Sequence, residues 1–272
     1  MWRYALRESG RWALALLGAF LIAVAVSALS LAKTGYGAAL LQRLAAFLKL
    51  DFGLSALSGT SALRQLAAHG PATFDLVLFG AVVALVLGLP LGLLLGGASA
   101  RRATAPLIQL VSAAPVFCAG LALAYVARQV GFQEGSALHG LVLPSIAVGL
   151  AGTAAVQRTL RRAASEAQDL PFRSGLRRLG LSALEIERVY VAPQVLANLL
   201  ANLGEVMLTL LSAAVVAEWV FASPGIADLF VKSIALADWN MAALILFVFA
   251  ALTATASFVG RIASRLVVQA AA

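Results

Sequence analysis

Long uninterrupted apolar stretches constrain the fold of this chain more than any other feature. Residues 12–32 read WALALLGAFLIAVAVSALSLA, and a helix needs about 20 apolar residues to cross the hydrocarbon core of a bilayer. Hydrophobic residues make up 62% of the sequence and charged residues 12%, against about 45–50% and about 25% in soluble domains. The polar groups are too few to cover a water-exposed surface, so part of the solvent must be lipid.

The apolar stretches also decide between the two architectures that a membrane allows. In hydrocarbon every backbone N–H and C=O must be paired within the protein, which leaves helical bundles and closed barrels. Barrel strands alternate apolar and polar residues, whereas the stretches here are continuous. We therefore predict an all-α, polytopic membrane protein with six transmembrane helices. The expected spans are residues 12–32, 72–98, 104–127, 138–157, 193–221 and 241–260.

The placement of positive charge predicts the orientation of these spans. Fourteen of the 20 Lys and Arg residues fall on one side of the six spans, together with both termini, and the other six fall on the opposite side. Cytoplasmic loops carry the excess of Lys and Arg, so we predict that both termini are cytoplasmic. The net charge of +8 follows from this topology and does not indicate a nucleic-acid partner.

The same patterns divide the chain into segments. The basic and aromatic start of the chain is typical of a helix that lies in the membrane interface. Residues 33–70 indicate a short amphipathic helix on the outer surface, followed by a loop. The expected segments are a cytoplasmic interfacial helix at 1–11, the first transmembrane helix with a short outer segment at 12–71, a core transmembrane domain at 72–266 and a C-terminal tail at 267–272.

The most polar stretch of the chain, residues 158–192, lies on the side predicted to be cytoplasmic. Apolar residues recur there at helical spacing on both sides of Gly180. This pattern predicts two short helices joined by a turn at the glycine, within a segment of about 160–190. Such a block suits docking of another protein, and an ordinary solvated loop remains the alternative.

Groupings of residues that support catalysis or metal binding are missing from the sequence. His69 and His139 lie at the predicted outer ends of spans, and no His, Cys and carboxylate cluster has ligand spacing. Cys118 lies within an apolar run and is interpreted as a packing residue. No GxxxxGK[ST] phosphate loop is present. We expect no catalytic residue, no metal site and no cofactor in this chain.

Acidic residues in the fifth predicted span are the best candidates for a transport role. Glu205 lies inside the span, where a charge is costly unless it faces a cavity or a partner; a packing residue is the alternative. Glu218 lies at the outer end, before a Pro-Gly turn that should send a short helix, residues 226–236, back across the outer mouth. A gate and a purely structural loop both remain open. The candidates for the translocation path or gate are Glu205, Glu218, Pro224, Gly225, Asp228 and Asp238.

An ordered set of motifs extends over residues 50–266. DFGLS and ATFDL occur early in this region, and residues 171–181 read PFRSGLRRLGL. Thirty-eight residues after Gly180, Glu218 opens the stretch EWVFASPGIADL. In these motifs and their order, the chain resembles the permease subunits of binding-protein-dependent ABC importers, in the dipeptide, oligopeptide and nickel branch.

The resemblance implies a permease of the bacterial inner membrane that is not itself an enzyme. It would form a heterodimer with a second, homologous permease, and the pair would enclose a path for peptides or similar small solutes that a periplasmic substrate-binding protein delivers. Two ABC ATPase subunits would bind ATP and Mg and would hold the cytoplasmic coupling helices of each permease. The residues implied in coupling are Phe172, Arg177, Arg178, Leu179, Gly180, Leu181, Leu184, Glu185 and Glu187.

Membrane lipid is the remaining partner that we expect. The alternative function is a secondary transporter or channel that acts without ATPase subunits. It would need several ionisable groups within the membrane or internal repeats, and we find one deep carboxylate and no repeat. A membrane-bound enzyme is a third reading, against which the missing polar cluster argues.

Overall fold

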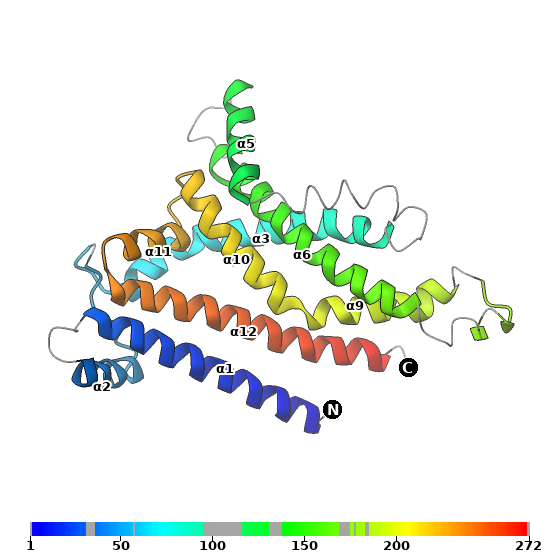
Figure 1. The fold of residues 1–272 in the computed structure, drawn as a ribbon, viewed down its shortest axis with the longest axis horizontal. Coiled ribbons are helices and arrows are strands. Elements are labelled where there is room, and N and C mark those ends of the chain that lie inside the picture. The colour runs from blue at the N-terminus through cyan, green and yellow to red at the C-terminus, as the bar shows by residue number, and fades with distance from the viewer. Residues whose placement is uncertain are drawn as a thin grey trace.

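The computed structural model shows a bundle of long helices (Figure 1). It describes residues 2–30, 36–56, 58–94, 116–130, 138–168, 175–176, 178–182 and 185–270. The long helices are α1 (Trp2–Ala28), α3 (Ala62–Leu94), α6 (Leu143–Gln168), α10 (Leu203–Val220) and α12 (Trp239–Ala270). The shorter helices are α2 (Tyr36–Leu48), α5 (Val116–Gln129), α9 (Ala192–Ala201) and α11 (Ile226–Ala235), and π-helical turns at Leu138–Val142 and Ile186–Val191 lead into α6 and α9.

Five helices in the described part of the chain are long and apolar enough to cross a membrane. They contain the segments Tyr4–Ala28, Ala62–Pro90, Gly140–Ala163, Leu203–Val220 and Trp239–Ala270. The prediction of an all-α membrane protein is therefore confirmed. The third expected span, 104–127, lies largely outside the described residues, which contain only α5 there, so the number six is not confirmed.

The segment borders that we expected fall inside helices. α1 runs without a break from Trp2, so the described residues 2–11 form its first turns and are continuous with the first span. The borders at 71/72 and 266/267 likewise fall within α3 and α12. Hydropathy reports where a helix is apolar, whereas the helix itself continues as long as its backbone hydrogen bonds do.

The fifth expected span is two helices rather than one. α9 ends at Ala201 and α10 begins at Leu203, because Asn202 leaves helical geometry with φ −102° and ψ 15°. Its side-chain amide donates to the Asn198 carbonyl at 2.8 Å, a bond that competes with regular helix structure. Two residues later, a Cβ at Gly204 would overlap Ser257 of α12. The break therefore sets α10 closely against α12.

Two apolar clusters hold the helices together. One joins α3, α6, α9 and α10 and includes Val156, Leu199 and Leu210. The other joins α1, α2, α11 and α12 and includes Phe47 and Leu244. The second cluster explains why the helix expected in residues 33–70 appears as α2, since Phe47 packs edge-on against Phe20 of α1 with ring centroids 6.0 Å apart.

Glycines allow α3 and α6 to approach closely. A Cβ at Gly80 would lie 2.7 Å from the Val148 side chain, and one at Gly149 would lie 2.5 Å from Val83. In lipid, helices associate mainly through such close packing, because the hydrocarbon competes equally for apolar surface. The α3–α6 pair is thus a rigid part of the bundle.

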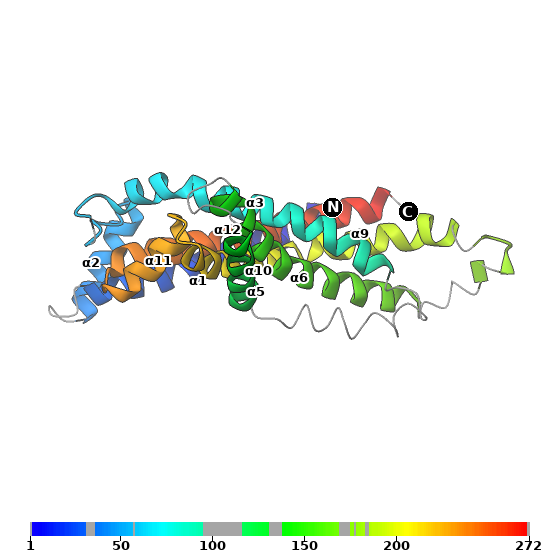
Figure 2. The same cartoon turned by 90° about the horizontal axis from the view of Figure 1, so that it is seen from above.

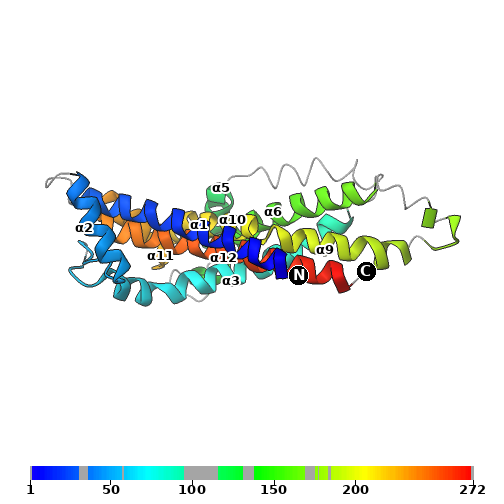
Figure 3. The same cartoon turned by 90° about the horizontal axis from the view of Figure 1, so that it is seen from below.

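Both chain termini lie at the same end of the bundle, and the turn at Gly180 extends beyond that end (Figures 1 and 3). We call it the terminal end. α2, α11 and the loop between α2 and α3 lie at the opposite end, which Figure 2 shows from above. We call that end the α11 end. The expected short helix at 226–236 is present there as α11.

Candidate gate and coupling sites

Glu218 is a buried carboxylate that joins three helices at the α11 end. Its side chain is 1% exposed. The Thr73 hydroxyl of α3 donates to Oε1 at 2.6 Å, and the Asp228 N–H of α11 donates to Oε2 at 2.8 Å. The Ile226 N–H donates to Thr73 Oγ1 at 2.7 Å. The first N–H groups of a helix lack partners within it and favour a negative group, so Glu218 and Thr73 fix the start of α11. We call Thr73, Glu218 and residues 225–228 the α11 hub.

The glycine of the Pro-Gly turn fits this hub because it has no side chain. The Ser223 N–H donates to the Glu218 carbonyl at 2.9 Å, and the Gly225 N–H donates to the Ser223 carbonyl at 2.9 Å. A Cβ at Gly225 would overlap the Glu218 carboxylate. Gly225 has φ −107°, so close approach and not backbone conformation is the reason for glycine.

The two aspartates among the candidates for the path or gate have different partners. Asp228 is buried in the hub, and its carboxylate pairs with Lys232 one turn later at 2.5 Å. Asp238 precedes α12, where its Oδ1 accepts the Met241 N–H at 3.2 Å as a helix cap. The Ser55 hydroxyl donates to Asp238 Oδ2 at 2.6 Å, which ties the loop between α2 and α3 to α12.

A cavity of about 630 Å³ opens beside the hub. It lies between the start of α3, the end of α10 and the turn that leads into α6, and its walls include Asp75, Gly140, Glu218 and Pro224. Asp75 is exposed, whereas Glu218 is engaged in the hub. The structure therefore brings Glu218, Pro224, Gly225 and Asp228 together.

Glu205 lies on the first turn of α10 and Glu218 on its last, so the two carboxylates belong to different sites. The nearest charged partner of Glu205 is Arg158 of α6, with Arg158 Nη2 3.7 Å from Glu205 Oε1. The two side chains are 41% and 49% exposed. Sequence reasoning identified Glu205 but placed it in a continuous span and did not find its arginine.

At the terminal end, Gly180 forms the turn that the sequence predicted. Its φ is +86°, in the left-handed region that glycine occupies without steric cost. No atom of the described residues lies within 4 Å of the position of a Cβ. The requirement for glycine here is therefore conformational.

Ser182 and Glu185 cap the helical turns that follow. The Ser182 N–H and hydroxyl donate to Glu185 Oε2 at 2.8 Å and 2.7 Å, and the Glu185 N–H donates to Ser182 Oγ at 3.3 Å. This is a capping box. The Ser182 hydroxyl and then its N–H hold the pKa of the Glu185 carboxyl below its ordinary value. The Ser-x-x-Glu spacing is visible in the sequence. We interpreted Glu185 there only as a coupling residue and did not recognise the capping box.

The leucines near Gly180 have different environments. Leu176 and Leu181 are partly buried against the cluster of α3, α6, α9 and α10. Leu179 is 78% exposed, and Arg178 beside it is also exposed. Leu181 thus anchors the turn to the bundle, and Leu179 is, among the described residues of the turn, an apolar side chain that is exposed.

Several expected coupling residues cannot be placed. Phe172, Arg177 and Leu184 lie outside the described residues, as does the side chain of Glu187. Among the side chains that the structure describes, no group of three or more His, Cys, Asp or Glu residues could hold a metal ion. His69 instead places Nδ1 3.0 Å from the Gln65 carbonyl of its own helix.

Comparisons with known proteins show which family the chain resembles. Residues 84–272 match the family described as binding-protein-dependent transport system inner membrane component. The peptide transport system permease protein SapB of Salmonella typhimurium is 27% identical over 70% of this chain and 71% of its own length. The dipeptide transport system permease protein DppB of Haemophilus influenzae is 26% identical over 70% of this chain and 67% of its own length.

A solved structure shows the same fold. An inward-facing structure of the MetNI methionine ABC transporter superposes with a TM-score of 0.58 over 75% of this chain and 97% of the matched chain, at 18% identity. Nothing in these comparisons supports the alternative of a secondary transporter or channel that acts alone. The family match covers well over half of the sequence and includes the Gly180 turn together with Glu218 and residues 225–228 of the α11 hub, and the chain therefore belongs to the family of binding-protein-dependent transport system inner membrane components.

Proposed function

We propose that this chain is one of two permease subunits of an ABC importer for peptides or similar small solutes. Its partners are a homologous permease, two ATPase subunits that bind ATP and Mg, and a periplasmic binding protein that delivers the solute. The family match and the peptide permeases among the relatives support this assignment. The observation that carries the mechanism is the exposed Leu179 on the Gly180 turn.

The terminal end faces the cytoplasm in this proposal. Both termini lie at that end, and they belong to the side of the predicted topology that carries 14 of the 20 Lys and Arg residues, in keeping with the excess of positive charge in cytoplasmic loops. Both termini are then cytoplasmic, and the α11 end faces the periplasm and the binding protein. The α11 hub would hold α11 across the outer mouth of the path.

The Gly180 turn docks to one ATPase subunit. Leu179 supplies an apolar contact, and the exposed Arg178 lies beside it. Surface ion pairs contribute less than about 1 kcal/mol each, whereas burying a leucine side chain contributes about 1.5–3 kcal/mol. Leu179 therefore carries more of the docking free energy than any single charge, with Phe172, Arg177, Leu184 and Glu187 as further contacts. Glu185 acts indirectly, because its carboxylate caps the helix that follows the turn.

The Arg158–Glu205 pair marks the side of the bundle that faces the path or the second permease. Both side chains are about half exposed, and charges within a membrane span are costly against lipid unless they face water or a partner. A peptide carries an ammonium and a carboxylate at its ends, which are opposite in charge to Glu205 and Arg158, respectively. We place the solute path along this side of α6 and α10.

Replacement of Leu179 tests the docking assignment. We expect Leu179→Glu to abolish co-purification of the ATPase subunits with the permease and to abolish ATP-dependent uptake, because a charge then replaces the apolar contact. Leu54→Glu is the matched control, since Leu54 is an exposed leucine (63%) in the loop at the α11 end. It should leave the ATPase subunits bound.

The opposite pattern would contradict the assignment. If Leu179→Glu retained the ATPase subunits and normal uptake, the Gly180 turn would not be the docking element. If both variants lost the ATPase subunits together with their helical structure, measured by circular dichroism, the milder Leu179→Ala would decide, with a reduced ATPase yield expected.

A further inference from the structure

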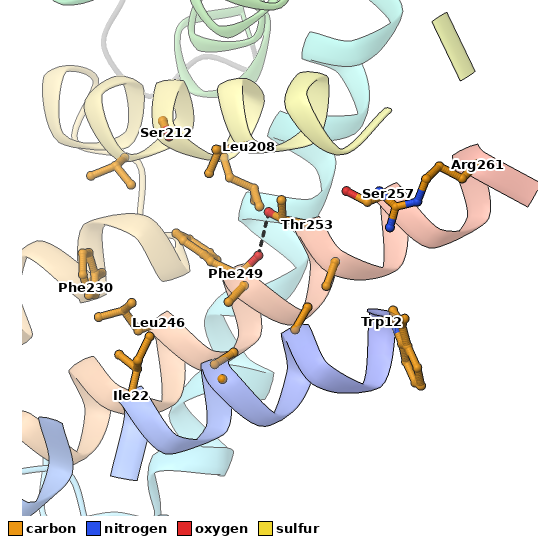
Figure 4. A pocket seen from close by; sticks show the side chains of 17 residues that line it. Trp12, Ile22, Leu208, Ser212, Phe230, Leu246, Phe249, Thr253, Ser257 and Arg261 are labelled. Atoms are coloured by element: carbon orange, nitrogen blue, oxygen red, sulfur yellow. Dashed lines mark hydrogen bonds between the residues drawn. The ribbon is translucent and has the colours of Figure 1, made fainter. Parts of the chain in front are cut away.

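An elongated groove runs along α12 between α1 and α10. Its volume is about 790 Å³, and Figure 4 shows its lining side chains in place. α1 contributes small residues, Ala15, Gly18 and Ala19, so that its wall is set back. Nothing lies within 4 Å of the position of a Cβ at Gly18. The groove therefore has open space beside Gly18 that no side chain of the described protein fills.

The two ends of this groove differ in chemistry. Towards the α11 end its lining is apolar, with Ile22, Phe230 and Leu246 (Figure 4). At the terminal end it closes on Trp12 and Arg261. Arg261 and Leu246 are separated by 15 positions of α12, which corresponds to roughly 22 Å of helix. The apolar part thus reaches at least as deep as one leaflet, about half of a 30 Å hydrocarbon core.

Positive charge is in excess at the terminal end of the groove. The buried Glu8 contacts two arginines, with one carboxylate oxygen 2.7 Å from Arg11 Nη1 and the other 2.6 Å from Arg261 Nε. One carboxylate cannot neutralise two guanidinium groups. α1 and α12 together contain five arginines and this single glutamate, all in the halves that face the terminal end.

We propose that the groove binds one acyl chain of an anionic phospholipid from the leaflet at the terminal end. The chain lies along Gly18, with the phosphate near Arg11 and Arg261. An apolar channel with cations at one end has the polarity of such a lipid, and basic pockets between transmembrane helices are suited to anionic headgroups. A helix of the second permease would match the apolar lining but gives no reason for the cations.

Quenching of Trp12 fluorescence tests this site directly. Trp12 lines the groove, and its indole N–H donates to the Thr255 hydroxyl at 3.3 Å, which fixes the ring. In the full chain with the other three tryptophans changed to phenylalanine, reconstituted in vesicles, we compare phosphatidylglycerol and phosphatidylcholine with brominated acyl chains. We expect phosphatidylglycerol to quench Trp12 with about fivefold higher relative affinity, the ratio for one unneutralised arginine near the membrane surface.

Two glycines of α1 supply the matched variants. Gly18→Phe should fill the groove and reduce the fivefold ratio to one. Gly10→Phe adds the same ring to the same helix, at a position that also has no atom within 4 Å of a Cβ but lies outside the groove, and should leave the ratio at fivefold. Equal quenching by the two lipids in the parent chain, or an unchanged ratio in Gly18→Phe, would overturn the proposal.

The assembled transporter provides the second readout. We expect native mass spectrometry of the complex to show retained phosphatidylglycerol that Gly18→Phe removes and Gly10→Phe does not. A complex without such lipid, in which Gly18→Phe instead reduces the yield of the second permease, would show that a protein helix occupies the groove. This test measures bound lipid and not transport. Its result is therefore independent of the assignment of the chain as an importer subunit.

Discussion

The α11 hub and the Gly180 turn are both glycine turns between helices, and they differ in what surrounds the glycine. Gly225 is required because the Glu218 carboxylate occupies the place of a Cβ. Gly180 is required because its φ is +86°, and no atom of the described residues lies where its Cβ would be. The Gly225 turn is packed inside the protein. The Gly180 turn has a backbone conformation that exposes the residues next to the glycine.

The side chains beside the two glycines also differ in exposure: one is buried and the other is exposed. Glu218 is 1% exposed and its oxygens accept hydrogen bonds from Thr73 and Asp228. Leu179 is 78% exposed and belongs to neither apolar cluster of the described residues. A buried polar group that is fully bonded is a structural element, whereas an exposed apolar residue at the tip of a turn suits a partner. The difference indicates that the hub shapes the permease and the Gly180 turn connects it.

Alanine at Gly225 should give the largest loss of stability. The added methyl group collides with a buried carboxylate, and overpacking of this kind costs about 1–3 kcal/mol. We expect Gly225→Ala to lower the thermal unfolding midpoint of the purified chain. Gly140→Ala is the control, because Gly140 lines the same cavity with no atom within 4 Å of a Cβ. Equal midpoints for the two variants would remove the distinction that we draw for the hub.

Loss of the Thr73 hydroxyl should destabilise the same hub by an amount of the same order. Thr73→Val leaves Glu218 and the Ile226 N–H each without one bond, and a buried group left unbonded costs about 1–3 kcal/mol. Thr153 is also buried, but its hydroxyl donates only to the Gly149 carbonyl of its own helix, at 2.8 Å. Denaturant titration of Thr73→Val and Thr153→Val should therefore show a loss only for Thr73. A larger loss for Thr153→Val would contradict the role of Thr73 as a link between α3 and α11.

The smallest predicted effect is a pH dependence confined to the Gly180 turn. The pKa of the Glu185 carboxyl is lowered by its bonds to Ser182, so the ionised form stabilises the cap. This stabilisation is fully present above the ordinary carboxyl pKa and is lost as the pH falls through the lowered pKa. Hydrogen exchange of residues 185–191, corrected for intrinsic rates, should lose protection over that range in the parent chain. The Glu185→Gln variant should show no such change, and a matching change in it would refute the explanation.

Local chemistry was readable from the sequence, because it depends on neighbouring residues. The Gly180 turn, the Pro-Gly turn and α11 all follow from spacing within about ten positions. Ser182 and Glu185 are three positions apart, and their capping box could have been recognised. Hydropathy predicted where the spans lie but not the break at Asn202, since one polar side chain among apolar neighbours changes a helix without changing its average hydropathy.

Contacts between distant parts of the chain were not readable. Thr73 and Glu218 are 145 positions apart, and only the packing of α3 against α10 brings them together. Glu8 and Arg261 meet for the same reason, through the pairing of the first and last long helices. The groove beside Gly18 also depends on that pairing. The sequence therefore identified Glu218 as an unusual carboxylate but could not say whether it was free or bonded.

Site-directed crosslinking of position 179 tests the central claim most directly. Cys118 is the single cysteine, so Leu179→Cys and Leu54→Cys can each be made in a Cys118→Ala chain and studied in cells that contain the complete transporter. We expect the thiol of the Leu179→Cys variant to crosslink to an ATPase subunit. The thiol of the Leu54→Cys variant should react instead with a membrane-impermeant maleimide added from the periplasm. Periplasmic labelling of the Leu179→Cys variant, with no crosslink to the ATPase, would contradict the account.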